Sequence, residues 1–355
     1  MGVKNLFKLI SEYAPNSITK KNIKEYNGKY IVLDASMIIY QYVIAIRSSG
    51  SDLQNTEGKM TSHILGVLSK TFLLLNNDIL PIFVFDGTPP ELKKDTLKIR
   101  KEIKKKNLAK LEATEDKEDQ IKYFKRSVSI TQNQIQEVKD ILKLFGIPII
   151  ESNTEADPLC ANLVSKGLAY GVSSEDMDLL AFGCSRLIRS LSSKKKAIEI
   201  NLQTLLEEMQ INQDQLVDLC ILLGCDYCET IPKIGPKRAY EKIKEHGSIK
   251  NFLENDEKVK NGYYKVPENY HENYQNAANF FKNPPLTKVT KLQLKMQKPK
   301  YNQIKEIMID VYDFKLNKVN QYLNKIKTFY NKGSTKHNKE INKYISPEYI
   351  LQKTH

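Results

Sequence analysis

Short apolar runs rich in β-branched and aromatic residues alternate with helical stretches through the first half of the chain, and this alternation constrains the fold most strongly. The runs typical of strands are KYIVLDAS (29–36), LPIFVFDG (80–87), FGIPIIES (145–152), AYGVSSEDMD (169–178), LIRSL (187–191) and AIEINL (197–202). Strands separated by helices form parallel sheets. We therefore predict an α/β fold with a mostly parallel central sheet flanked by helices.

Acidic residues end several of these predicted strands. Asp34 and Asp86 close the first two runs, and Asp176 and Asp178 close the fourth. In open parallel sheets, ligands bind beyond the carboxyl ends of the strands. We therefore expect these four carboxylates to share one rim of the sheet, with the neighbouring Glu175 pointing elsewhere.

Three more acids are candidates for the same rim. Glu155 and Asp157 follow the third run in ESNTEADPL, where Thr154 can cap a helix whose first turn holds both acids. Acids in a first turn also favour the helix dipole, which is an alternative explanation for them. Asp226 ends a later helix at LLGCD, where a carboxylate opposes the dipole and needs another reason.

Seven converging carboxylates would repel one another, and each would resist ionising. Mg²⁺ and Mn²⁺ relieve this repulsion, because they take oxygen ligands from carboxylates and keep water for a substrate. The five histidines do not adjoin this acid set, which argues against a histidine-rich zinc centre. Two such ions suit phosphodiester hydrolysis. The candidate metal ligands are Asp34, Asp86, Glu155, Asp157, Asp176, Asp178 and Asp226.

Basic residues are in excess, and the excess is concentrated in one segment. The formal net charge is +13 and the pI about 9.2, which favours a polyanionic partner, nucleic acid before an acidic membrane surface. Residues 93–110 carry nine Lys or Arg and two acids, with few apolar residues to bury. This segment is predicted to be a helix that is mobile without a partner. It is either a solvated charged helix or an arch that contacts phosphates.

Helices replace strands after residue 203. NQDQLVDLCILLG (212–224) is predicted to be a helix that begins after Asn212 and ends at Gly224. Residues 231–248 are predicted to form a helix, a tight turn at Gly235 and a second helix. The tail is predicted to be helical to about Tyr330 and disordered beyond it, because it is rich in Lys.

The cysteines and the N-terminus place only weak constraints on the function and location of the protein. Cys225 and Cys228 form a lone CxxC, which is either a metal or redox pair or a pair of buried thiols near a helix end. No apolar stretch is long enough to span a membrane, and the N-terminus lacks a signal-peptide core, so we predict a protein that is not secreted and has no membrane partner.

Several long motifs, in order, resemble the flap structure-specific endonucleases of the 5′-nuclease superfamily. These are MGVKNLFKLI, VLDASMIIYQ, TSHILG, FVFDGTPPELK, SSEDMDLLAFG and LLGCDYCETIPKIGPKRA, and the similarity extends from Met1 to about residue 330. The resemblance implies a nuclease that cuts 5′ flaps at branched DNA in replication and repair, with an associated 5′-3′ exonuclease activity. It implies two Mg²⁺ ions, replaceable by Mn²⁺, on the seven acids.

The resemblance also implies roles for other residues. Lys93 and Arg100 would contact the scissile phosphate, and Tyr40 would stack on a base near the cut. A helix–hairpin–helix would meet duplex phosphates, often through K⁺. The implied DNA-binding residues are Gly2, Tyr40, Arg47, Thr61, Gly235, Pro236, Lys237 and Arg238.

The implied organisation is one nuclease domain over residues 1–330, followed by a basic, flexible tail at 331–355. Within the domain, 1–107 is an N-terminal region, 93–130 a helical arch, and 125–255 an internal region with the hairpin at 231–248. The chain departs from the pattern at Asp157, where the family usually has Glu.

The resemblance implies a nuclear location if the source is eukaryotic. We otherwise expect a monomer inside the cell, and the richness in Lys, Asn and Ile leaves a viral source open. Sliding-clamp binding stays open, because the best match to a clamp-binding motif is degenerate. That match consists of Asn338, Ile341, Tyr344 and Ile345.

Other functions stay open from the residues alone. The nearest is a 5′-3′ exonuclease of the same superfamily; the excision-repair branch is disfavoured because the segment from Asp86 to Glu155 is short. A catalytically inactive scaffold for branched DNA would keep the basic segments but would not need all seven acids. The Asp176-Met-Asp178 pattern also occurs as the DxD of nucleotide-sugar transferases and phosphatases, which do not require a basic hairpin.

Overall fold

The computed structural model describes residues 3, 5–48 and 50–344, with side chains described as far as Lys332. Gly2 and Ile345 therefore lie outside the described residues, and Asn338, Ile341 and Tyr344 lie where only the backbone is described. None of the described helices is long and apolar enough to cross a membrane.

A seven-stranded sheet forms the centre of the molecule, in the order β1-β7-β6-β5-β2-β3-β4. The strands are β1 (Ile18–Lys21), β2 (Tyr30–Asp34), β3 (Leu80–Phe85), β4 (Ile149–Glu151), β5 (Gly171–Ser173), β6 (Arg186–Arg189) and β7 (Ala197–Asn201). β2 pairs in parallel with both β3 and β5, and β3–β4 and β5–β6 are parallel too. Only the β6–β7–β1 edge is antiparallel among these strands. The predicted mostly parallel α/β fold is therefore confirmed.

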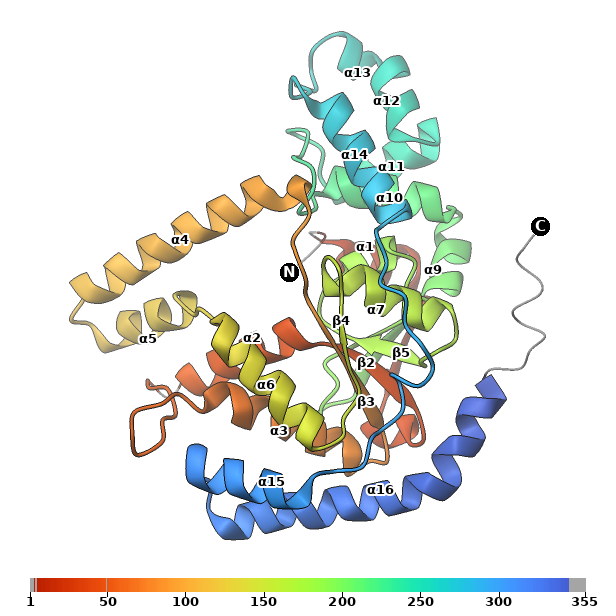
Figure 1. Ribbon diagram of the computed structural model, residues 1–355. Helices are drawn as coiled ribbons and strands as arrows, with labels where there is room; N and C mark the ends of the chain where they lie inside the picture. Colours follow the sequence, from red (N-terminus) through yellow and green to blue (C-terminus); the bar gives the residue numbers. More distant parts are fainter. Residues whose placement is uncertain (1–2, 4, 49, 345–355) are drawn as a thin grey trace.

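Helices cover both faces of the sheet and extend beyond its edges (Figure 1). They are α1 (Leu6–Tyr13), α2 (Ala35–Arg47), α3 (Ser62–Leu75), α4 (Lys94–Ala113), α5 (Lys117–Arg126), α6 (Gln132–Leu144), α7 (Ala156–Ser165), α8 (Asp178–Ala181), α9 (Leu202–Met209), α10 (Gln213–Leu223), α11 (Pro236–His246), α12 (Ile249–Asn255), α13 (Glu257–Lys260), α14 (Tyr270–Lys282), α15 (Tyr301–Glu306) and α16 (Leu316–Tyr344). A short π-helix, Ile307–Val311, follows α15.

Two hydrophobic cores form because side chains alternate between the faces of each strand. In β2, Val32 packs into a core that contains residues of α7 and α10, whereas Ile31 and Leu33 pack into the other core. That second core contains residues of α2, α3, α6 and α16. Both faces of β2 and β3 are thus buried, which agrees with their continuous apolar sequences.

Two groups of helices project from this layered body (Figure 1). α10 to α14 form a lobe beyond one end of the sheet, and α4, in orange, extends outward from the same end with α5 folded back beneath it. Every side chain of α4 is at least partly exposed. The helix expected in the basic segment is therefore present, with little of it packed on the body.

Several local expectations are wrong. The strand β1 was not predicted, because its sequence Ile-Thr-Lys-Lys contains only one apolar side chain. α16 continues to Tyr344, beyond the predicted end near Tyr330, because its Lys-rich sequence keeps good helix propensity and contains no proline. Disorder was expected beyond Tyr330 because of the positive charge of the lysines, but such charge does not by itself stop helix propagation.

The segment 231–248 does not form a helix, a tight turn and a second helix. Residues 232–233 form a turn within the loop after α10, and the helices that follow are α11 and α12. Gly235 is the N-cap of α11 at φ −92°, a conformation open to any residue, so its proposed special turn geometry is wrong. Gly247 does end α11 in the left-handed region, at φ 78°.

Gly87 allows two acid-bearing segments to lie side by side at the end of the sheet. Its N–H donates to the Thr154 carbonyl at 2.6 Å, next to Asp86 on one segment and Glu155 on the other. A Cβ at position 87 would lie 2.1 Å from the Ser152 carbonyl oxygen. A side chain here must push the two backbones apart.

We expect Gly87→Ala to lower the free energy of unfolding by about 1–3 kcal/mol, because the added methyl overpacks against backbone. Gly235→Ala is the control: no atom lies within 4 Å of its Cβ position, but Gly is favoured over Ala at this N-cap, so a net change of less than about 1 kcal/mol is expected. Urea unfolding of both variants measures the difference. An equal or higher stability of Gly87→Ala than of the control would contradict the close approach.

Candidate active site

Three of the candidate acids are fixed by the backbone at the ends of β2 and β5. Asp34 is the N-cap of α2, and its Oδ1 accepts the Met37 N–H at 3.0 Å. Asp176 Oδ1 accepts the Asp178 N–H at 3.0 Å, and Asp178 Oδ1 accepts the Val3 N–H at 2.6 Å. All three carboxylates are buried. The N-terminal segment therefore closes over one side of this acid group.

The acids that follow β3 and β4 are linked across the sheet edge. Asp86 Oδ1 accepts the N–H of Ala156, the first residue of α7, at 2.8 Å. Glu155 is the N-cap of α7, so the expected cap at Thr154 is wrong; Asp86 supplies a hydrogen bond to this helix end instead. Asp157 lies in the first turn, as expected.

Mutual repulsion and burial raise the pKa values of these carboxyls. Burial raises the pKa of Asp34 to about 8, and the charge of Asp86 adds to the rise. The pKa of Asp157 is raised well above its ordinary value by burial first and then by the charges of Asp176 and Asp34. Burial and the charge of Asp176 likewise raise the pKa of Asp178 well above its ordinary value. These acids therefore lie close enough to act as one electrostatic unit.

Basic residues at the base of α4 contact the remaining part of this group. Lys93 Nζ is ion-paired with Glu155 and lies 3.1 Å from Asp226 Oδ2, and Arg100 lies 2.7 Å from Asp226 Oδ1. Although burial opposes the charged form, Glu155 and Asp226 raise the pKa of Lys93 above its ordinary value. Asp226 lies beyond the end of α10, which finishes at Leu223, so the dipole argument made for it does not apply.

The donor set of this acidic rim fits a hard divalent cation. Its donors are carboxylate oxygens, and the buried Asp157 Oδ1 has no hydrogen-bond partner among the described residues. No three of the seven acids, all within the described part of the chain, bring carboxylate oxygens within 4.8 Å of one another. Mg²⁺ tolerates such spacing, because it often binds one or two carboxylates directly and keeps several waters.

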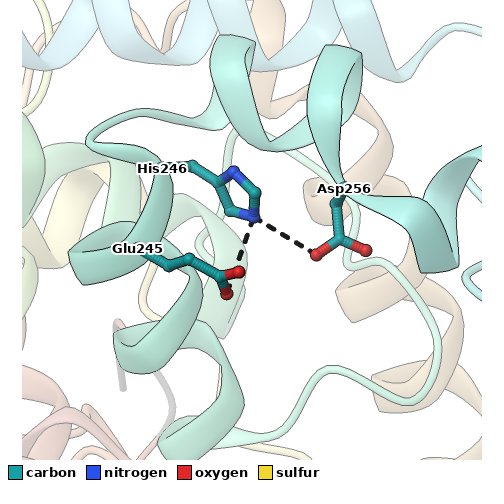
Figure 2. Close-up of side chains that lie close together, drawn as sticks. All are labelled: Glu245, His246 and Asp256. Atoms are coloured by element: carbon teal, nitrogen blue, oxygen red, sulfur yellow. Dashed lines mark hydrogen bonds and ion pairs between the residues drawn. The ribbon is translucent and has the colours of Figure 1, made fainter.

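A second cluster of potential metal ligands lies in the helical lobe, away from the rim. Figure 2 shows the His246 ring between the carboxylates of Glu245 and Asp256, at 3.7 Å and 3.2 Å. Lys242 Nζ is 2.6 Å from Glu245 and 2.7 Å from Asp256. A lysine ammonium thus already neutralises these carboxylates, and the cluster is an ion-pair network that joins α11 to the start of α13.

The remaining predicted residues occupy varied environments. Tyr40 is half-buried on α2, and Thr61 is buried at the start of α3. The Arg47 guanidinium forms two bonds to Asp52, at 2.9 and 3.0 Å, and donates to the Phe124 carbonyl of α5 at 3.1 Å. Any DNA contact by Arg47 would compete with these internal partners.

The predicted hairpin residues lie at the exposed start of α11. Gly235, Lys237 and Arg238 are exposed, and Pro236 is half-buried in the first turn. Lys237 pairs with Glu12 at 2.5 Å, and Arg238 donates to the Lys233 carbonyl at 2.9 Å.

Two further side chains complete the surroundings of the rim. Glu175 accepts the Ser190 N–H at 2.6 Å and pairs with Arg189 at 3.1 Å. Tyr227, which the sequence analysis did not single out, donates its hydroxyl to Glu155 Oε2 at 2.5 Å. Its position directly after Asp226 was the available signal, but its partner is 72 residues away in sequence.

A rim of buried carboxylates at the ends of parallel strands, bordered by a basic helix, defines a class of protein: a metal-dependent phosphodiesterase built on an α/β fold. Comparison with known proteins agrees. Residues 1–107 match the XPG N-terminal domain, and residues 146–226 match the XPG I-region.

Similar proteins specify the family. The chain is 40% identical to Flap endonuclease 1 of Caenorhabditis briggsae, over 90% of this chain and 84% of that protein. It is 41% identical to Flap endonuclease 1 of Nematostella vectensis, over 90% of this chain and 85% of that protein. The chain therefore belongs to the flap endonuclease family, whose members are metal-dependent nucleases of DNA replication and repair.

Solved structures share the fold. Flap endonuclease-1 from Methanococcus jannaschii matches with a TM-score of 0.70 and 29% identity, over 92% of this chain and 98% of that one. The catalytic core of Rad2 in complex with DNA substrate also matches with a TM-score of 0.70, at 23% identity, over 92% of this chain and 100% of that one. At that identity the second match supports the fold alone.

In the absence of divalent ions, we expect the free energy of unfolding to fall as the pH rises from about 4 to about 8. The unfolded chain loses the Asp34 proton near the ordinary pKa of 3.8, whereas the folded chain keeps it until the pH approaches about 8. The folded state binds more protons in this window, so raising the pH favours unfolding.

Urea unfolding in a chelator at several pH values measures this slope. Asp34→Asn should make it shallower, because the amide carries no charge to desolvate. Mg²⁺ should stabilise the wild type more at the alkaline end, where it no longer competes with protons. The same slope in wild type and Asp34→Asn would contradict the assignment.

Proposed function

We propose that this chain cleaves 5′ flaps at branched DNA junctions by two-metal-ion phosphodiester hydrolysis, with an associated 5′-3′ exonuclease activity. One observation carries the proposal: carboxylates buried at the strand ends raise one another's pKa values, and Lys93 and Arg100 of the basic segment pair with acids of the same group. Carboxylates alone would repel a phosphate. A metal-loaded rim beside fixed cations would attract one.

The seven acids would hold two Mg²⁺ ions, with Mn²⁺ as a substitute, some through water. When bound, such ions supply an activated water and neutralise charge that builds on the attacking and leaving oxygens. Asp157 would reach its ion through water or a small shift, since its side chain is one methylene shorter than the usual Glu. Asp34, Asp176 and Asp178, each held by a backbone N–H, would keep fixed positions during turnover.

Lys93 and Arg100 would exchange their carboxylate partners for the scissile phosphate. Both already lie at the edge of the acid group, so small side-chain movements suffice. Their charges would then stabilise the transition state, in which the phosphate gains negative charge. Tyr40 is half-buried on α2, the helix that begins directly after Asp34, and would stack on a base near the cut.

The remaining proposed contacts are those to the unpaired strand and to the duplex of the DNA substrate. Residues 93–130 would act as an arch over the unpaired strand, and Gly235, Pro236, Lys237 and Arg238 would meet duplex phosphates, with K⁺ at this site. Gly2, Arg47 and Thr61 are further proposed contacts. One nuclease domain over residues 1–330 would act as a monomer, in the nucleus of a eukaryotic source or inside the cell otherwise. Sliding-clamp binding is not part of the proposal.

A labelled double-flap DNA with Mg²⁺ tests the reaction directly. We expect wild type to release the flap strand, and Asp178→Ala to be slower by more than about 100-fold, since even residues that support a metal ligand typically contribute about 10–100-fold. Glu175→Ala is the matched control in the same turn, and its rate should stay close to wild type because Glu175 is bound to Ser190 and Arg189.

Three outcomes would count against the proposal. The absence of cleavage by wild type would favour a non-catalytic scaffold, and release of single nucleotides only would favour a 5′-3′ exonuclease. Equal rates for Asp178→Ala and wild type would overturn the metal-centre assignment.

The arch makes a separate prediction about salt. Lys105 and Lys106 are exposed on α4, and each phosphate contact to a single strand contributes about 0.7 to the slope of log affinity against log salt. We expect Lys105→Ala with Lys106→Ala to reduce this slope by about 1–2. Lys24, exposed before β2 at the opposite end of that strand from the rim, is the matched control. Fluorescence anisotropy with Ca²⁺ measures the slope, and equal slopes in both variants would exclude the contacts.

A further inference from the structure

The turn that carries Asp226 also carries an aromatic side chain, Tyr227, that contacts the acid group at Glu155. The backbones of Cys225 and Cys228, both free thiols, form an isolated antiparallel β-bridge. This bridge places Asp226 and Tyr227 together at the tip of the turn. Asp226 contacts Lys93 and Arg100, whereas Tyr227 contacts Glu155. Two neighbouring residues therefore reach two different parts of the acid group.

Tyr227 is held rigidly by other aromatic side chains. Its ring centroid lies 4.9 Å from Phe280 and 5.2 Å from Phe281, both on α14, and 6.4 Å from Phe182 at the end of α8. Tyr227 is only 5% exposed. A ring packed on several sides loses its freedom to rotate, so its hydroxyl has one fixed direction. That direction is toward Glu155 Oε2.

The two oxygens of Glu155 have different partners. Oε1 is ion-paired with Lys93, and Oε2 accepts the Tyr227 hydroxyl. A divalent cation would displace the Lys93 ammonium, because like charges repel, but it need not displace a neutral phenol. An ionised carboxylate has about four acceptor positions, so Oε2 can keep its hydrogen bond while Oε1 binds an ion.

We propose that Tyr227 is a positioning residue of the metal centre, whose hydroxyl orients the Glu155 carboxylate so that Oε1 is the oxygen presented to a divalent ion. The inference rests on the proposed function, since it needs Glu155 to be a metal ligand. It also gives α14 a role: this helix, near the C-terminal end of the lobe, fixes a ligand at the start of α7 through one hydroxyl.

Tyr227→Phe tests the inference, because it removes the hydroxyl and keeps the packed ring. We expect Mn²⁺ binding to the DNA-free protein, measured by calorimetry or electron paramagnetic resonance, to weaken by about 10-fold, as for other residues that orient metal ligands. The Mg²⁺ concentration for half-maximal cleavage should rise similarly, while kcat at saturating Mg²⁺ changes less. The midpoint of thermal unfolding without metal should fall by only a few degrees, because Glu155 loses one buried hydrogen bond but keeps its ion pair with Lys93.

Tyr270→Phe is the matched control. Tyr270 is also fully buried on α14, but its hydroxyl has no hydrogen-bond partner among the described residues. Its loss should leave Mn²⁺ binding unchanged. Tyr227→Phe should also add little in a Glu155→Ala background, since the two residues act through one contact.

The outcomes distinguish failure of the proposed function from failure of the role assigned to Tyr227. If wild type binds no Mn²⁺, the proposed function itself fails. If wild type binds and Tyr227→Phe binds equally well, only the role of Tyr227 is overturned. A matching loss in Tyr270→Phe, or a full additional loss in the Glu155→Ala background, would show that packing and not the hydroxyl is responsible, which also overturns it.

Discussion

Repulsion between carboxylates confined in one poorly hydrated place is the constraint on which the rest of this structure depends. Burial raises the pKa of Asp34 to about 8 and raises those of Asp157 and Asp178 well above the ordinary value. A fold tolerates such a group only where rigid backbone holds it and cations relieve it. The parallel sheet supplies the rigidity, because its strands end at one rim, where Asp34, Asp86, Asp176 and Asp178 each accept a backbone N–H.

The basic helix α4 belongs to the same electrostatic system. Lys93 and Arg100 pair with Glu155 and Asp226, so part of the negative charge is neutralised from within the chain. The rest of α4 is exposed and Lys-rich, which suits a polyanion more than a protein core. In the proposed function, the same cations that stabilise the acid group without metal would receive a phosphate, and this dual use would explain why a basic chain concentrates acids beside its core.

The parallel sheet and its acidic strand ends could be predicted from the sequence, because continuous apolar runs and strand-terminal carboxylates are local signals. Strand runs at β2 and β3 are continuous and apolar, and their order relative to helices leaves few topologies. The polar strand β1 gave no such signal, since its pairing with β7 at the sheet edge is what makes it a strand. Thr154 has the chemistry of a cap, yet Asp86, which is distant in sequence, bonds the first N–H of α7. Arg47 was expected to face DNA, but it binds the nearby Asp52, and its bond to the Phe124 carbonyl depends on where α5 folds back.

The sequence by itself determined the α/β class, the seven acids, the basic segment and the family, because each is written in residue type and local spacing. Only the tertiary structure decided which atoms meet. It places Lys93 between Glu155 and Asp226, and Lys242 between the carboxylates beside His246. It also brings the hydroxyl of Tyr227, whose ring packs against phenylalanine side chains, to Glu155. The reason is geometric. Hydrogen bonds and ion pairs act over a few ångströms, and chain segments far apart in sequence reach that range only when packing of the whole fold brings them together.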